Sequence, residues 1–184
     1  MKKHARPKGD SRREEIPRIK GARAAPKAER LGEGERGIDV PLPPPLIFLG
    51  LFVIGSVTGY FIPIPLLPSA AALPTGIVIA LAGVYLSLVS FREFARAKTS
   101  PDFRPVRAIV SAGPYRYTRN PIYISFSTIY AGLGIAFNSL VTFLPLLVAI
   151  AVVDRVIVPR EERYLEKRFG EEYLRYKAKV RRWV

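Results

Sequence analysis

The chain has 184 residues, of which 49% are hydrophobic, and its formal net charge is +14 at pH 7. This length leaves room for one domain of moderate size. There is no cysteine, and the single histidine, His4, lies in a charged N-terminal segment, which excludes disulfides, thiolate nucleophiles and cysteine or histidine metal sites, so we expect no metal centre. Any chemistry must use carboxylates, tyrosines, arginines, backbone groups or a bound cofactor.

Residues 1–44 mix Lys, Arg, Glu, Gly and Pro with few large apolar residues, a composition that cannot bury a core. We predict a disordered, basic cytosolic tail. It is not a secretory signal, because the first apolar stretch begins only near Leu46 and is long enough to span a membrane. The tail lacks the aromatic residues of a nucleic-acid stacking platform, and attraction to anionic lipid explains its charge. We therefore expect membrane lipids and no nucleic acid as partners.

Two long stretches contain no Asp, Glu, Lys or Arg: one between Val40 and Phe91, the other between Asn120 and Val153. The first divides at the Pro-rich run 63–68 and the second at 137–139, and each piece is about long enough to cross a bilayer core. We predict an all-α, polytopic membrane bundle over residues 45–184, with four transmembrane helices in two tight hairpins. The predicted spans are about 46–62, 73–91, 122–137 and 139–158.

An even number of spans places all charged segments on one face of the membrane. Lys and Arg exceed Asp and Glu in each segment, which marks that face as cytoplasmic. We therefore expect an integral membrane protein with both termini and its active site in the cytosol. Small residues such as Gly76 and Gly83 are typical of close helix packing. No buried ionisable residue marks an ion path in the first two spans, which argues against a charge-coupled transporter.

The stretch from Gly113 to Tyr123 combines turn formers, aromatics and cations just before an apolar segment. Asn120 is suited to cap the following helix and Pro121 to occupy its first position. Free N–H groups, the positive helix end and the cations of Arg116 and Arg119 would together form an anion site. An equally good interpretation is a basic, aromatic loop that anchors a membrane helix at the headgroup level.

The segment 159–183 predicts an interfacial amphipathic helix that lies along the membrane surface or covers a pocket there. Its apolar side chains recur at intervals of three and four, as on one helix face, and we expect Gly170 to bend it. Glu161 and Glu162 stand at its start, where a pair of glutamates is by default a favourable dipole interaction. The apolar positions are Leu165, Phe169, Tyr173, Tyr176, Val180 and Trp183.

Two motifs occur in a fixed order. Gly-Pro-Tyr-Arg-x-x-Arg-Asn-Pro-x-Tyr, starting at Gly113, is followed by two spans and then, from Glu161, by Glu-Glu-x-x-Leu-x-x-x-Phe-Gly-x-x-Tyr-x-x-Tyr. Over roughly Phe91 to Val184 the chain resembles the isoprenylcysteine carboxyl methyltransferase and phospholipid methyltransferase group of integral membrane enzymes. The resemblance implies S-adenosylmethionine as methyl donor, bound at the cytosolic end of the last spans. It also implies a lipophilic acceptor with a carboxylate or an amine.

The resemblance also assigns roles to residues. The cofactor carboxylate suits the helix start at Pro121, its ammonium and ribose hydroxyls suit Glu161 or Glu162, and its adenine suits Tyr123, Tyr164 or Phe169. Arg182 would either anchor an acceptor carboxylate or be a surface cation. The expected catalytic residues are Arg119, Asn120, Glu161 and Arg182. The expected cofactor-binding residues are Tyr115, Arg119, Asn120, Pro121, Tyr123, Glu161, Glu162 and Tyr164.

The chain departs from the family pattern at two positions. Many members have His at the position of Asn120 and Gly at the position of Ser125. Asn can cap a helix but cannot transfer a proton as an imidazole does, so the difference favours an acceptor that is already nucleophilic. The alternative function is that of a non-catalytic membrane scaffold or lipid-binding protein that retains the fold.

Overall fold

The computed structural model describes residues 42–99 and 107–184, all within the compact unit Gly32–Val184. Nearly all of the predicted tail 1–44 lies outside the described residues. The described part is helical, with one isolated bridge between Thr118 and Arg181 in place of any sheet, so the all-α prediction is confirmed. The elements are α1 (Pro44–Phe61), α2 (Ser69–Arg96), η1 (Gly113–Arg116), α3 (Pro121–Ala136), α4 (Phe143–Val152), η2 (Val153–Ile157), α5 (Val158–Phe169) and α6 (Glu171–Lys179).

Three of these helices coincide with predicted spans. α1 and α3 begin and end within two residues of the predicted limits, while α2 is longer at both ends and continues into the charged residues Arg92–Arg96. By length and composition α1 and α2 are candidate membrane spans, and α3 is a shorter apolar helix. At about 1.5 Å per residue, α2 exceeds a hydrocarbon core of about 30 Å, so its charged end can project beyond that core.

The fourth apolar segment begins later than predicted and is not a separate helix. α4, the π-helical turn η2 and α5 follow one another without a break, and the Val158 N–H donates to the Val153 carbonyl five residues earlier. Pro159 has no N–H to continue the regular ladder, which is one physical reason for a π turn at this point. The last apolar segment therefore continues directly into the charged helix α5.

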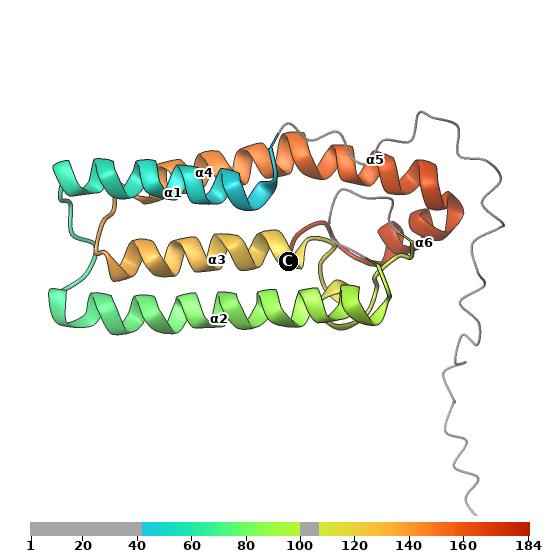
Figure 1. Cartoon of the computed structure of the whole chain (residues 1–184), viewed down its shortest axis with the longest axis horizontal. Coiled ribbons are helices and arrows are strands. Elements are labelled where there is room, and N and C mark those ends of the chain that lie inside the picture. Colours follow the sequence, from blue (N-terminus) through green and yellow to red (C-terminus); the bar gives the residue numbers. More distant parts are fainter. Residues whose placement is uncertain (1–41, 100–106) are drawn as a thin grey trace, which may run out of the picture. The chain divides into compact units, whose positions relative to one another are not determined.

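α3 is the central helix of the bundle and lies between α2 on one side and the α1–α4 pair on the other (Figure 1). Gly76 and Gly132 bring α2 and α3 so close that a Cβ at either position would clash with the backbone of the opposite helix. This contact agrees with the predicted use of small residues in packing. The predicted tight hairpin of the first two spans differs from the structure, because α2 packs mainly on α3 and α1 mainly on α4.

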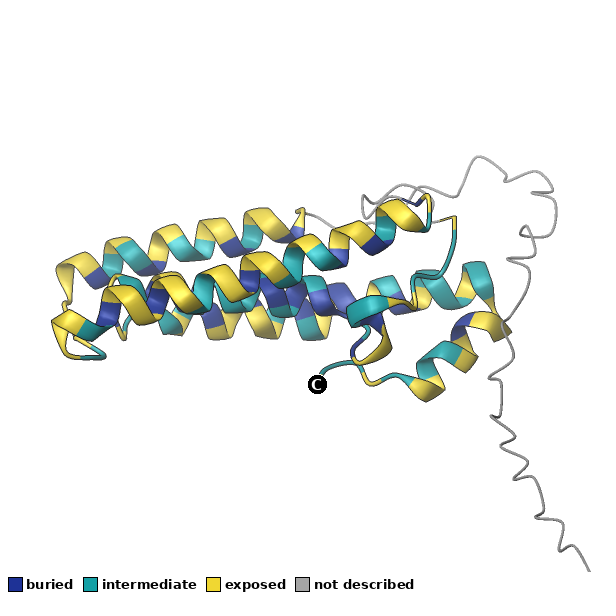
Figure 2. Ribbon diagram, turned by 90° about the horizontal axis from the view of Figure 1, so that it is seen from below, coloured by how far each residue is buried: buried dark blue, intermediate teal, exposed yellow. Residues whose placement is uncertain are grey.

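The surfaces of α1 and α2 that face away from α3 and α4 are rich in exposed residues (Figure 2). Many of these residues are large and apolar, including Leu49, Val53, Val78 and Leu81. Exposed apolar surface of this extent is unfavourable in water and is expected of helices in contact with lipid tails. The exposure pattern thus agrees with the candidate membrane spans.

The C-terminal segment does not form the single helix predicted over 159–183. α5 ends before Gly170, whose φ of 52° lies in the left-handed region that glycine adopts without strain, and α6 ends at Lys179. Val180 is extended, and Arg181 pairs with Thr118. The predicted bend at Gly170 is therefore present, but Trp183 leaves the helical face on which the sequence pattern placed it.

Candidate functional site

The loop that precedes α3 is held by two neighbouring parts of the chain. Tyr115, in η1, is buried and packs its ring edge-to-face against Phe94 of α2, with 5.5 Å between ring centroids. The Tyr176 hydroxyl of α6 donates to the Tyr115 carbonyl at 2.8 Å. The two sequence motifs, which start at Gly113 and Glu161, are therefore in contact in the structure.

Asn120 occupies the N-cap position of α3, and Pro121 is the first residue of the helix, as predicted. The predicted side-chain cap is wrong, because the Asn120 amide Nδ2 instead donates to the Arg182 carbonyl at 3.0 Å. The Tyr123 and Ile124 N–H groups both donate to the Asn120 carbonyl, and Pro121 has no N–H. The helix start therefore offers fewer donors to an anion than we expected.

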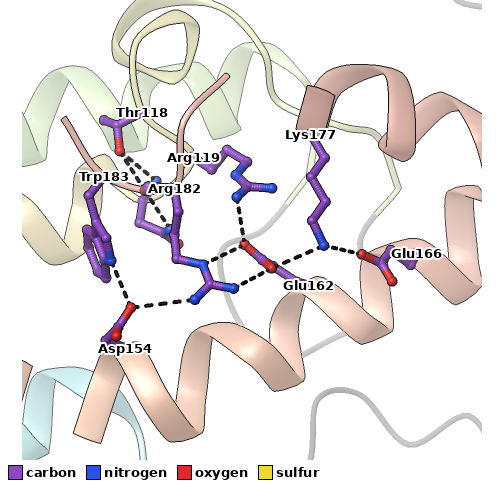
Figure 3. A network of polar contacts seen from close by, with 9 residues as sticks. Thr118, Arg119, Asp154, Glu162, Glu166, Lys177, Arg182 and Trp183 are labelled. Atoms are coloured by element: carbon purple, nitrogen blue, oxygen red, sulfur yellow. Dashed lines mark hydrogen bonds and ion pairs between the residues drawn. The ribbon is translucent and has the colours of Figure 1, made fainter. Parts of the chain in front are cut away.

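Residues 180–184, which we call the C-terminal strap, lie along this loop. The Arg119 N–H donates to the Arg181 carbonyl at 2.9 Å, and the Thr118 hydroxyl donates to the Arg182 carbonyl at 3.0 Å. Figure 3 shows Thr118, Arg182 and Trp183 in this region. Because the Arg182 carbonyl accepts from both Thr118 and Asn120, the strap fixes the backbone that carries Arg119.

Glu162 is the centre of the charge network beneath the strap (Figure 3). Its side chain is only 7% exposed. The Arg182 guanidinium donates to both of its oxygens, from Nε at 3.2 Å and Nη2 at 3.0 Å. Arg119 Nη2 lies 3.2 Å and Lys177 Nζ 3.4 Å from the same carboxylate. Glu162 therefore orders three cations.

The charge state of Glu162 follows from these contacts. Burial acts to raise the pKa of its carboxyl, but the hydrogen bonds from Arg182 and the charges of Arg119 and Lys177 act in the opposite direction, and the pKa is lowered overall. Glu162 is thus an anion whose oxygens are engaged by the protein itself. This arrangement makes it a support for the cations around it more than a direct ligand of a small molecule.

The Arg119 guanidinium has unused binding capacity. Its side chain is 10% exposed, and one terminal nitrogen, Nη2, pairs with Glu162. Within residues 42–99 and 107–184, neither Nε nor Nη1 has a hydrogen-bond partner. Unpaired donors on a buried guanidinium are costly, and each can donate a charge-assisted hydrogen bond to an anion. The site therefore fits an anionic group at Arg119.

Glu161 has surroundings very different from those of its neighbour. The Tyr123 hydroxyl donates to its Oε1 in a short hydrogen bond. Burial and the charge of Glu162 raise the pKa of Glu161 to about 7, although the hydrogen bond from Tyr123 acts to lower it. No cation pairs with Glu161 within the described part of the chain. Its carboxyl can therefore change charge near neutral pH and can accept a cationic group.

Several tyrosines surround these carboxylates. Burial raises the pKa of the Tyr115, Tyr173 and Tyr176 hydroxyls, so all three are neutral donors. The sequence pattern assigned Tyr173 and Tyr176 to the apolar face of a helix, whereas the structure adds them to the site. Tyr164 is partly exposed, and the Phe169 ring lies under the Arg168 guanidinium at 5.9 Å. The fully buried Ser125 hydroxyl bonds to the Ile122 carbonyl of its own helix at 2.7 Å.

The structure adds residues that the sequence analysis did not select. Asp154 Oδ1 accepts a hydrogen bond from Trp183 Nε1 at 2.8 Å and lies 3.6 Å from Arg182 Nη1. Lys177 bridges Glu162 and Glu166, with its Nζ 2.6 Å from the latter. Asp154 could have been noticed as the first charge after a long uncharged stretch. In the described residues no cluster of His, Cys, Asp and Glu could hold a metal ion.

A family model described as phospholipid methyltransferase matches residues 72–172. The chain belongs to the phospholipid methyltransferase family. The match extends from α2 into α6 and includes the loop before α3 and both glutamates. The resemblance inferred from the two motifs is therefore confirmed, and membership implies a methyltransferase with lipid-type substrates. The strap, residues 180–184, lies beyond the matched range.

A relative of this family member is an uncharacterised protein of Haemophilus influenzae. It is 38% identical to this chain over 63 residues, which are 34% of this chain and the whole of that protein. No solved structure shows a significant match to the chain. The family match and the apolar helices α1 and α2 together indicate association with a membrane.

Proposed function

We propose that this family member transfers a methyl group from S-adenosylmethionine to the carboxylate or amine of a lipophilic acceptor at the cytosolic membrane interface. The observation that carries the proposal concerns the described residues: two buried donors of Arg119 have no hydrogen-bond partner, and Glu161, which adjoins the partner of Arg119 in sequence, has no cationic partner. The amino-acid part of S-adenosylmethionine carries one carboxylate and one ammonium group. Arg119 and Glu161 are complementary to these two charges.

Arg119 would donate to the cofactor carboxylate through Nε or Nη1, because its remaining nitrogen, Nη2, is held by Glu162. Glu161, in its ionised form, would accept the ammonium or a ribose hydroxyl. Glu162 holds Arg119 in place without binding the cofactor itself. Of the two glutamates, Glu161 is therefore the one that would bind the cofactor ammonium or ribose. When bound, the cofactor supplies an electrophilic methyl group on a sulfonium.

Aromatic side chains would form the remaining wall of the cofactor site. Tyr115 and Tyr123 lie close to Glu161, as the electrostatic effects of these groups on one another require. Their rings, together with that of Tyr164, are suited to stack on adenine or to face the sulfonium. Pro121, two residues before Tyr123, fixes the start of α3.

Asn120 and Arg182 have positioning roles in this proposal. The Asn120 amide and the Arg182 guanidinium are engaged by protein groups, the Arg182 carbonyl and Glu162 respectively. In this proposal neither residue moves a proton. Catalysis then consists mainly of aligning acceptor and methyl donor and excluding water. An acceptor that is already nucleophilic, such as a carboxylate, suits a site without a histidine.

The proposal includes four membrane spans: α1, α2, α3, and α4 with η2. The Arg92–Arg96 end of α2, the loop before α3 and the charged residues from Asp154 onward all flank the apolar segments on the side of the candidate site. The excess of Lys and Arg there indicates the cytosolic face. A lipophilic acceptor would then reach the site from within the bilayer.

The test is S-adenosylmethionine binding by titration calorimetry of the detergent-purified full chain, followed by transfer of a radiolabelled methyl group into a total lipid extract. We expect saturable binding with one site per chain and label in the organic phase. A non-catalytic scaffold that retains the fold predicts no transfer. Absence of binding by a folded protein would contradict the proposed cofactor.

A further inference from the structure

The C-terminal strap is attached to the body of the protein by the Trp183 side chain. Trp183 Nε1 donates to Asp154 Oδ1 at 2.8 Å, and the indole packs against the buried apolar cluster that contains Val153 and Ile157. Asp154 lies on the π-helical turn η2, at the end of the last apolar segment. π turns are rare and often occur at functional positions.

The strap also connects Trp183 to the proposed cofactor site, through the contacts of Arg182. The residue before Trp183, Arg182, uses its carbonyl to hold Thr118 and Asn120, and its guanidinium to hold Glu162. Glu162 in turn pairs with Arg119. A continuous series of hydrogen bonds and ion pairs therefore connects Asp154 to the guanidinium whose free donors would bind the cofactor carboxylate.

We propose that Asp154 and Trp183 form a latch that holds the C-terminal strap across the cofactor site, with Asp154 as a positioning residue for Arg119. This inference rests on the proposed function, because it gives the strap a purpose in cofactor binding. When the hydrogen bond between Asp154 and Trp183 breaks, Arg182 is no longer held in position. Glu162 and Arg119 then lose one of the contacts that orient them. The latch thus determines the orientation of groups that it does not contact.

Trp183 is the single tryptophan of the chain, so intrinsic fluorescence reports on the latch directly. We expect a blue-shifted emission with little acrylamide quenching in the wild type. Asp154→Ala should shift the emission to the red and increase the quenching constant several-fold. Asp154→Asn retains an oxygen that can accept from the indole and should remain close to the wild type. Lys179→Ala, a change to an exposed cation just before the strap, is the matched control and should alter neither signal.

Cofactor affinity tests whether the latch positions the site. Asp154→Ala and Trp183→Phe each remove one partner of the hydrogen bond, and Phe keeps most of the ring that packs on the core. Each should weaken S-adenosylmethionine binding by about fivefold to tenfold, the range for loss of one hydrogen bond. Because both remove the same contact, the double variant should bind no more weakly than the weaker single variant.

The outcomes separate the two proposals. Unchanged quenching in Asp154→Ala would overturn the latch, whether or not the cofactor binds. An exposed Trp183 with unchanged cofactor affinity, or fully additive losses in the double variant, would overturn the positioning role. If the wild type binds no S-adenosylmethionine, the proposed function and the positioning role both fail, while the fluorescence of Asp154→Asn and Asp154→Ala still decides whether the latch exists.

Discussion

Arg182 donates two hydrogen bonds to Glu162, from Nε at 3.2 Å and from Nη2 at 3.0 Å, although twenty residues separate them in sequence. This bidentate pair joins the C-terminal strap to α5. It also explains why two adjacent glutamates have different properties. Glu162 is an anion that pairs with three cations. Glu161 instead accepts a hydrogen bond from Tyr123, and its pKa is about 7.

Arg119→Lys should weaken S-adenosylmethionine binding while leaving the fold intact. Lys keeps a positive charge for Glu162 but lacks the further guanidinium N–H donors, Nε and Nη1, that would bind the cofactor carboxylate. The expected loss is about 1.5–3 kcal/mol of binding free energy, the range for a hydrogen bond between charged groups, measured by calorimetry. Arg116→Lys, a change to an exposed cation three residues earlier, is the control. Equal affinity in both variants would place the cofactor carboxylate elsewhere.

The stability of the cofactor-free protein should fall as the pH rises toward 7, in part because of Glu161. The pKa of Glu161 is about 7 in the folded protein, above its ordinary value of 4.5. The stabilising contribution is thus complete below about pH 4.5 and is lost as the pH rises through 7. Glu161→Gln should remove this loss and stabilise the protein by on the order of 2 kcal/mol at pH 8.

Melting temperatures in detergent at pH 5 and pH 8 check this effect. The difference between Glu161→Gln and the wild type should be small at pH 5 and positive at pH 8. Glu171→Gln alters an exposed carboxyl at the start of α6 and serves as the control. A Glu161→Gln variant that keeps the full pH dependence of the wild type would contradict the assignment.

The two adjacent glutamates should respond in opposite ways to the same substitution at pH 8. Glu162→Gln leaves Arg119, Arg182 and Lys177 without their shared anion and should destabilise the protein by about 2–3 kcal/mol. Glu161→Gln should instead weaken cofactor binding while raising the stability of the free protein. Thermal melts and calorimetry on both variants measure these quantities. Similar behaviour of the two variants would mean that the pair is only a favourable interaction with the helix dipole.

Asn120→Asp should reduce both stability and cofactor affinity. Asp cannot donate to the Arg182 carbonyl, so two acceptors would face one another, at a cost of about 1–3 kcal/mol, and its charge would compete for Arg119. Asn120→His retains a donor and should be tolerated better in both measurements. If the side chain acted only as a helix cap, Asp would equal Asn in melting temperature and His would be worse.

The four-span topology can be tested by labelling single cysteines, because the chain has none of its own. Pro65→Cys lies in the exposed connection between α1 and α2, and Lys179→Cys lies at the exposed end of α6. A membrane-impermeant maleimide should label Pro65→Cys in intact cells and Lys179→Cys only after permeabilisation. Labelling of both positions in intact cells would eliminate the four-span arrangement.

The sequence by itself determined the helical class, the positions of α1, α2 and α3, and the family. Long uncharged stretches can satisfy their backbone groups in lipid only as helices, and Pro-rich breaks mark their ends. Arg119, Asn120, Tyr123 and the glutamate pair were selected because residue types in a fixed order carry the family's chemistry. Local patterns of this kind need no knowledge of the remaining fold.

Only the tertiary structure decided how these residues are used. The Asn120 side chain bonds to the strap instead of capping α3, because a carbonyl from residue 182 lies within its reach. Glu161 and Glu162 differ because one contacts a tyrosine and the other three cations, all contributed by segments distant in sequence. Trp183 lies outside the predicted helix because α6 ends at Lys179 and Val180 is extended, and the indole Nε1 donates to Asp154. Hydrogen bonds and ion pairs between distant segments depend on three-dimensional proximity, and the periodicity of a sequence does not show which segments are close in space.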